Sequence, residues 1–278
     1  MPLIKHLNLQ NLLLRHVAIP SDHGSWVFLF SPLLIGIFAG SSWNLATIFL
    51  VITALAAFLI RQPVVIAVKI YSGRRNRREL PAAWFWTAVY SIIGSVGVAG
   101  LVFQGFGFLL ILALPGIPVF TWHLYLVSKR AERRNIGVEI VGSGVLALAA
   151  PAGYWIGIGE IALMGWLLLI LTWLQSAASI VYAYLRLQQR ELVKIPPIRT
   201  RIQMALRALI YSTFNLILVI GLGLINLVSP FLFLPYLLQW GETIWGSINP
   251  AVGKRPTAIG FRQLFISTLF TLLFILTW

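Results

Sequence analysis

The chain has 278 residues, of which 59% are hydrophobic and only 10% are charged, and its mean hydropathy is +0.89. Soluble domains carry about 25% charged residues, so this composition excludes a water-soluble globular protein and predicts a polytopic membrane protein. There are 21 Lys and Arg against 7 Asp and Glu, a net charge of +14, and no cysteine. Disulfides, thiolate metal sites and cysteine nucleophiles are therefore excluded.

Nine segments are long and apolar enough to cross about 30 Å of hydrocarbon, which takes about 20 residues. In chain order they are 24–41, 43–60, 82–103, 107–128, 137–154, 160–184, 203–227, 229–247 and 259–278. They predict an all-α fold, a polytopic integral membrane bundle of about nine transmembrane helices. The boundary between the seventh and eighth segments, at Ser229-Pro230, is the least clearly defined. We expect residues 1–23 to form an amphipathic interfacial segment and residues 24–278 to form a single transmembrane domain.

The basic residues predict the orientation of this bundle. All 21 Lys and Arg precede the first segment or follow the second, fourth, sixth and eighth, whereas the turns 40–44, 104–107, 154–159 and 226–230 hold none. Because basic loops stay in the cytoplasm, we expect a cytoplasmic N-terminus and a non-cytoplasmic C-terminus. The two densest clusters, 73–78 and 129–134, are assigned to topology and to contact with anionic headgroups, and not to nucleic acid.

The start of the first segment carries the clearest local motif, Pro20-Ser21-Asp22-His23-Gly24-Ser25-Trp26. One interpretation is a capped helix start anchored at the membrane interface, in which Gly24 lets another backbone come close. The other is that Asp22 and His23 form an acid–base or ligand-holding pair at the mouth of a cavity. Asp22 is the only Asp of the chain.

This Pro-x-x-His-Gly-x-Trp motif, with Pro32 and Gly36 behind it, resembles the YwiC-like family of bacterial membrane proteins. The resemblance continues at Arg61-x-Pro63, at Tyr184-x-Arg186 to Arg190, and at Lys254-Arg255-Pro256-x-x-Ile259-Gly260. Asp22 stands where Glu or Gln is expected. The resemblance implies a multi-pass protein of a bacterial inner membrane, of plasma or thylakoid type, and implies no defined activity.

The predicted architecture also resembles that of the UbiA-type prenyltransferases, whose basic loops follow the same spans. Those enzymes hold a prenyl diphosphate through magnesium ions bound by Asp-rich motifs. Magnesium prefers carboxylate and phosphate oxygens, and the corresponding stretches here, 61–78 and 182–190, contain no Asp. We therefore expect no metal site, no cofactor and no magnesium–diphosphate chemistry.

Single arginines near the segment ends are candidate ligand-binding residues, because a guanidinium binds phosphate or carboxylate through two N–H donors. These are Arg61, Arg186, Arg190 and Arg255. The alternative is that each extends separately to the lipid headgroups.

Glu242 is the only acid well inside a predicted segment, and Gln239 and Thr243 share its helix face at i, i+3, i+4 spacing. A buried Glu commonly pairs with an Arg. One interpretation is that these residues join helices by hydrogen bonds. The other is that they carry a proton or contact a substrate.

The sequence thus predicts one cytoplasm-facing cavity around Asp22, His23, Arg61, Arg186, Arg190 and Arg255, with Gln239 and Glu242 deeper along its wall. The favoured function is binding or processing of an isoprenoid- or quinone-like lipid, with a membrane lipid or hydrophobic small molecule as partner. Two alternatives stay open: a small-solute transporter or exporter, and a non-catalytic assembly factor with a membrane-protein partner. Whether the protein is an enzyme is left open by the sequence.

Overall fold

The computed structural model describes residues 12–20, 23–132 and 135–278, and for His23 it describes the backbone only. Every regular element in these ranges is helical, so the predicted all-α fold is confirmed. The helices divide into two compact units: unit 1, with residues 1–23 and 43–138, and unit 2, with residues 24–42 and 139–278. The single domain expected over 24–278 stays a prediction.

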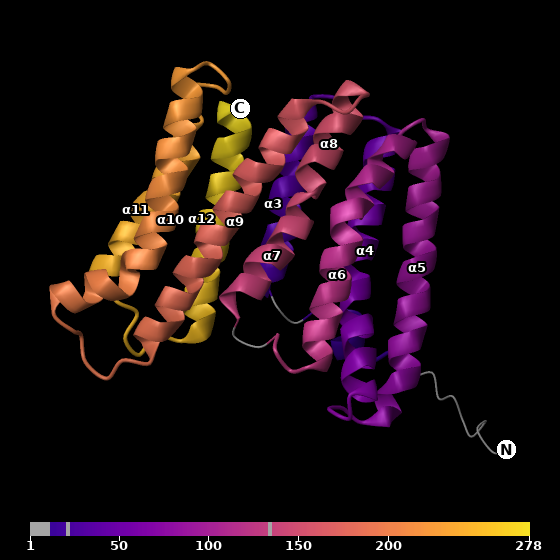
Figure 1. Cartoon of the computed structure of the whole chain (residues 1–278), viewed down its shortest axis with the longest axis horizontal. Coiled ribbons are helices and arrows are strands. Elements are labelled where there is room, and N and C mark those ends of the chain that lie inside the picture. The colour runs from indigo at the N-terminus through magenta and orange to yellow at the C-terminus, as the bar shows by residue number, and fades with distance from the viewer. Residues whose placement is uncertain (1–11, 21–22, 133–134) are drawn as a thin grey trace. The chain divides into compact units, whose positions relative to one another are not determined.

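Unit 1 is built on α4 (Leu45–Tyr71) and α5 (Leu80–Phe103), which pack side by side, together with α6 (Ala113–Ser128) (Figure 1). The 3₁₀ helices η1 (Arg77–Glu79) and η2 (Gly107–Leu112) precede α5 and α6. Asn44 and Thr47 form a capping box that fixes the start of α4, because the side chain of each binds the backbone N–H of the other.

The described part of the N-terminal segment includes the short helix α2 (Arg15–Ala18), which packs on α4 and α5. Trp86 Nε1 donates to the carbonyl of Leu12 at 3.0 Å, and the Tyr90 hydroxyl donates to that of Ala18 at 2.9 Å. Residues 1–11 of the expected interfacial segment lie outside the described residues.

Unit 2 contains α3 (His23–Gly40), α7 (Ile136–Ala147), α8 (Ala149–Ile158), α9 (Leu163–Arg190), α10 (Ile198–Leu224), α11 (Phe233–Ile248) and α12 (Pro256–Thr277). Helices α3 and α8 approach closely at glycines. A Cβ at Gly153 would lie 2.6 Å from the backbone nitrogen of Ile37, and one at Gly36 would overlap the carbonyl of Ala150. Small residues at such positions let membrane helices pack backbone to backbone.

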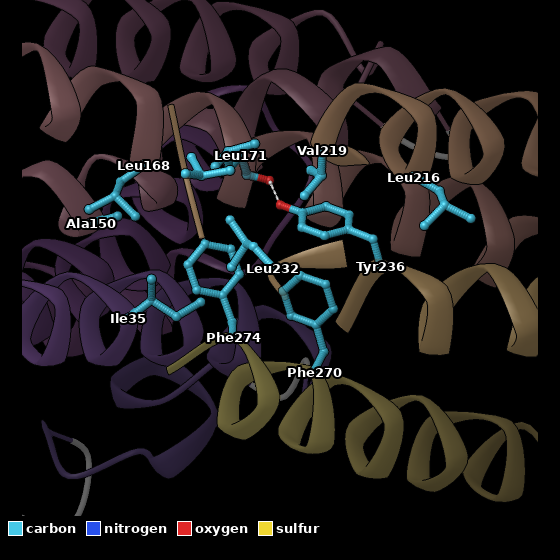
Figure 2. Packing of buried hydrophobic residues seen from close by; sticks show 11 residues of the cluster. Ile35, Ala150, Leu168, Leu171, Leu216, Val219, Leu232, Tyr236, Phe270 and Phe274 are labelled. Carbon is cyan, nitrogen blue, oxygen red and sulfur yellow. Dashed lines mark hydrogen bonds between the residues drawn. The ribbon is translucent and has the colours of Figure 1, made fainter. Parts of the chain in front are cut away.

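The other core of unit 2 surrounds α9, which contacts α8, α10, α11 and α12. Figure 2 shows the apolar cluster in which Leu171, Tyr236, Phe270 and Phe274 are buried together. The Tyr236 hydroxyl donates to the carbonyl of Leu171 at 3.1 Å, so its one polar atom is satisfied inside this cluster.

Seven helical segments of the described chain are long and apolar enough to cross a membrane. They are 45–71, 77–103, 107–128, 136–158, 163–190, 198–224 and 256–277. The predicted first and eighth spans correspond to the shorter helices α3 and α11, so the count of nine stays a prediction. The predicted second span, 43–60, forms only the first part of a longer helix, since α4 continues to Tyr71 with Arg61 and Pro63 inside the helix. A charged residue does not end a helix, because it can lie on a polar face beyond the hydrocarbon.

Candidate functional site

The structure places the predicted site residues in different units. Asp22 lies outside the described residues, and His23 begins α3 with its side chain undescribed. Arg61 belongs to unit 1, whereas Arg186, Arg190, Gln239, Glu242 and Arg255 belong to unit 2. Convergence of all eight residues on one cavity therefore stays a prediction.

A pocket of about 220 Å³ lies between α9, α12 and the part of α11 that carries Glu242. Two of the predicted residues, Arg186 and Glu242, line it together. The complete lining is Tyr182, Arg186, Glu242, Lys254, Ala258, Ile259, Arg262 and Gln263. The pocket thus contains three cationic side chains and one carboxylate.

Glu242 is held from two sides. Its Oε1 accepts hydrogen bonds from Arg262 Nε at 2.6 Å and from the Tyr182 hydroxyl at 2.8 Å, and its Oε2 accepts one from Arg262 Nη2 at 2.7 Å. The carboxylate is only 8% exposed, while the Arg262 side chain is 42% exposed. The expected pairing of this buried Glu with an Arg is therefore found, with Arg262 as the partner.

Gly246 makes room for this arrangement. A Cβ at this position on α11 would overlap the hydroxyl of Tyr182. A glycine one turn after Glu242 therefore lets the Tyr182 ring enter between α9 and α11 and reach the carboxylate.

The three cations of the pocket all lie close to the ring of Trp245. The guanidinium carbon of Arg262 lies 3.5 Å from the ring centre, that of Arg186 lies at 5.3 Å, and Lys254 Nζ lies at 5.6 Å. A cation within about 6 Å of an indole centre is attracted by the negative face of the ring. Trp245 therefore helps to keep three like charges close together.

Arg186 is 3% exposed and is satisfied by neutral acceptors. Its Nη1 donates to Gln189 Oε1 at 2.9 Å and to the carbonyls of Gly246 at 2.8 Å and Asn249 at 2.7 Å. Neither Arg186 nor Lys254 makes an ion pair with a carboxylate of the described residues. Two positive charges at the pocket are therefore left without a counter-charge from this part of the chain.

Gln239 lies one turn from Glu242 on α11 but is not among the residues that line the pocket. Its Nε2 donates to the carbonyl of Gln175 at 3.0 Å and to Ser179 Oγ at 3.1 Å. Its Oε1 is buried and has no hydrogen-bond partner among the described residues. The side chain joins α11 to α9, which is the interhelical role that the sequence left as one alternative.

The remaining predicted arginines do not line the pocket. Arg190 is half-buried at the end of α9, and its carbonyl accepts a 3.4 Å hydrogen bond from the backbone of Gly253. Arg255 is exposed and precedes α12 as its N-cap residue. In unit 1, the guanidinium of Arg61 lies 5.7 Å from the ring centre of Phe58.

Sequence reasoning missed Tyr182, Trp245, Lys254 and Arg262 as site residues. One signal could have identified Arg262, since it is the only basic residue inside the predicted last span, 259–278. An isolated charge in a span needs a partner, and Glu242 is the only acid well inside another span. At Gly24 a Cβ would meet no described atom within 4 Å, so the close backbone approach expected there stays a prediction.

No group of three or more His, Cys, Asp or Glu in the described ranges could hold a metal ion. The residues present at the pocket suit an anion, because they offer guanidinium and ammonium donors around one carboxylate.

Comparisons with known proteins show similarity to one family. Residues 19–154 match the family model described as YwiC-like protein. A relative named "Uncharacterized protein YwiC", from Bacillus subtilis (strain 168), is 23% identical over 175 residues, which are 62% of this chain and 68% of that protein. No solved structure matches. The resemblance to the YwiC-like family that the sequence predicts is thereby confirmed over residues 19–154. The motifs at 184–190 and 254–260 lie beyond the residues that the family model matches, and the UbiA-like arrangement stays a prediction.

Proposed function

We propose that this multi-pass membrane protein, which matches the YwiC-like family over residues 19–154, binds an amphipathic lipid whose anionic head enters the pocket at Arg186, Lys254 and Arg262. The observation that carries this proposal is the charge of the pocket, with three cations and one carboxylate inside a group of apolar helices. Unpaired cations are unfavourable near hydrocarbon, so an anionic ligand would stabilise them.

An apolar surface beside the pocket would accommodate the rest of such a ligand. Phe261 and Phe265, one turn apart on α12, are both exposed, and Phe261 directly precedes the pocket residue Arg262. A lipid chain that lies along this face keeps its contact with the bilayer while the head binds Lys254 and Arg186. Isoprenoid- and quinone-like lipids, the class expected from the sequence, belong to this description when they carry an anionic group.

The packing of unit 2 favours binding over transport. Farther along α9, α11 and α12, the residues Leu171, Tyr236, Phe270 and Phe274 are buried together in one apolar cluster (Figure 2). A solute that entered at Arg186 would meet this cluster before reaching the other ends of the helices. We therefore propose a site that opens toward one side only.

In this proposal the pocket faces the cytoplasmic leaflet of a bacterial inner membrane. Arg201 of α10 donates to the carbonyl of Ile248 at 2.6 Å, so the α9–α10 and α11–α12 connections lie at the same end of unit 2. These connections carry the basic residues of the unit or lie beside them, and the positive-inside rule assigns that end to the cytoplasm. We assign no catalytic step and no magnesium-bound diphosphate.

Native mass spectrometry of the purified full chain tests the proposal. The wild-type protein is expected to carry an anionic lipid, whereas Lys254→Gln is expected to lose most of it. Lys194→Gln is the matched control, since Lys194 is exposed in the α9–α10 connection and does not line the pocket. Retention of only neutral lipids, or equal retention by both variants, would contradict the proposal.

A further inference from the structure

Glu242 accepts the N–H donors of Arg262 in the way that an anionic ligand would. Arg262 Nε and Nη2 donate to the two oxygens of the carboxylate at 2.6 and 2.7 Å. Paired N–H donors to two oxygens are the usual geometry by which arginine binds a carboxylate or a phosphate. Glu242 is also the only carboxylate that lines the pocket.

The three cations of the pocket therefore differ in what they offer to a ligand. Arg262 is neutralised by Glu242, while Arg186 donates to carbonyl and amide oxygens, and Lys254 has no ion pair within the described chain. All three lie within 6 Å of the ring centre of Trp245. A ligand that binds Lys254 and Arg186 thus comes close to Arg262 and also to the negative charge of Glu242.

We infer that Glu242 is a built-in competitor for the anionic ligand and sets the affinity of the pocket for phosphate-type groups. This inference rests on the proposed function. Without a ligand, the Glu242 carboxylate accepts the Nε and Nη2 hydrogen bonds of Arg262. Its negative charge also repels an entering anion. A ligand must either bind only Lys254 and Arg186 or displace the carboxylate from Arg262. In both cases Glu242 lowers the affinity for the anionic ligand.

The test is the isosteric variant Glu242→Gln, which removes the charge and keeps an oxygen that can accept from Tyr182. Its matched control is Glu139→Gln. Glu139 is exposed on α7, accepts a 2.6 Å hydrogen bond from the Tyr184 hydroxyl of α9, and does not line the pocket. Both variants change the net charge by one unit, and both replace a glutamate that accepts a hydrogen bond from a tyrosine of α9.

The probes are monoacylglycerol phosphate and inorganic phosphate, titrated into the detergent-purified full chain at constant ionic strength. We expect Glu242→Gln to bind monoacylglycerol phosphate about tenfold more tightly than the wild type, a difference of about 1.4 kcal/mol. Glu139→Gln is expected to stay within twofold of the wild type. Glu242→Asp, which keeps the charge, is also expected to stay near the wild-type affinity.

The outcomes separate this inference from the proposed function. Wild-type binding that depends on Lys254 but is equal or weaker in Glu242→Gln would overturn the inference and leave the proposed function standing. An equal gain in Glu242→Asp would also overturn it, since the charge would then not matter. Absence of Lys254-dependent binding in every variant would contradict the proposed function itself. Wild-type affinity for inorganic phosphate equal to that for monoacylglycerol phosphate would support a free anion as the ligand and contradict the lipid.

Discussion

Arg262 and Glu242 are joined across the contact between α12 and α11 by two hydrogen bonds of 2.6 and 2.7 Å. The glutamate is buried, whereas the Arg262 side chain keeps 42% of its surface exposed. Because solvent screens the exposed partner, the pair adds little to stability compared with a fully buried ion pair. Its main consequence is electrostatic, since it decides how much positive charge the pocket presents.

Arg186→Leu is expected to destabilise unit 2 by about 3 kcal/mol, because buried acceptors then lose a charged donor. Those acceptors are Gln189 Oε1 and the carbonyls of Gly246 and Asn249. The measurement is thermal unfolding in a fixed detergent. Arg190→Leu is the control, because its guanidinium makes no hydrogen bond or ion pair with the described residues. Equal unfolding temperatures for the two variants would show that the Arg186 contacts do not stabilise the fold.

Gly153→Ala is expected to destabilise the protein by about 1–3 kcal/mol, because the added methyl group meets the backbone of α3 at Ile37 and overpacks the contact. Gly142→Ala on α7 serves for comparison, since its Cβ would meet no described atom within 4 Å. The higher helix propensity of alanine should leave that variant unchanged or up to about 1 kcal/mol more stable. Unfolding in detergent distinguishes them, and no loss in Gly153→Ala would mean that α3 and α8 do not pack as described.

Arg74 and Arg75 are sequence neighbours with different expected contributions. Arg74 Nη2 donates to Glu132 Oε1 at 2.8 Å and to the carbonyl of Val127 at 2.7 Å, and the Arg74 and Glu132 side chains are 12% and 10% exposed. Arg75 pairs with Glu79 at a more exposed position. We expect Arg74→Ala to destabilise unit 1 by about 3 kcal/mol and Arg75→Ala by less than about 1 kcal/mol. Limited proteolysis of the 129–135 connection measures this, and equal cleavage rates would contradict it.

The proposed topology predicts that a reporter fused after Trp278 is active only on the non-cytoplasmic side. The reason is that the basic connections, which the positive-inside rule keeps in the cytoplasm, lie at the other end of α12 from Trp278. The measurement compares two fusions at this position, the activity of alkaline phosphatase and the fluorescence of a reporter that fluoresces only in the cytoplasm. Cytoplasmic activity would mean an even number of spans, and α3 and α11 are the helices whose crossing would then be in doubt.

The sequence predicted the class of fold and part of the site, for identifiable reasons. Hydropathy alone indicates membrane helices, and the isolation of Glu242 among apolar residues marks it as a residue that needs a partner. The identity of that partner depends on how α11 and α12 pack, and Arg262 is separated from Glu242 by a turn that hydropathy does not resolve. The sequence did not predict that α4 continues to Tyr71, because charged residues such as Arg61 and Lys69 are typical of loops between membrane spans. Both residues lie within the helix. The close contact of Gly36 with Ala150 likewise depends on packing between helices far apart in sequence.

The most direct test of the account is the affinity of the full chain for monoacylglycerol phosphate, measured by equilibrium titration for the wild type, Lys254→Gln and Lys194→Gln. The loss of one positive charge at the pocket should weaken binding by about 1 kcal/mol, or roughly fivefold. Lys194→Gln should keep the wild-type affinity, and neutral monoacylglycerol should bind none of the three specifically. Equal affinities of the two lysine variants for the phosphate lipid would contradict the claim that this pocket binds the anionic head.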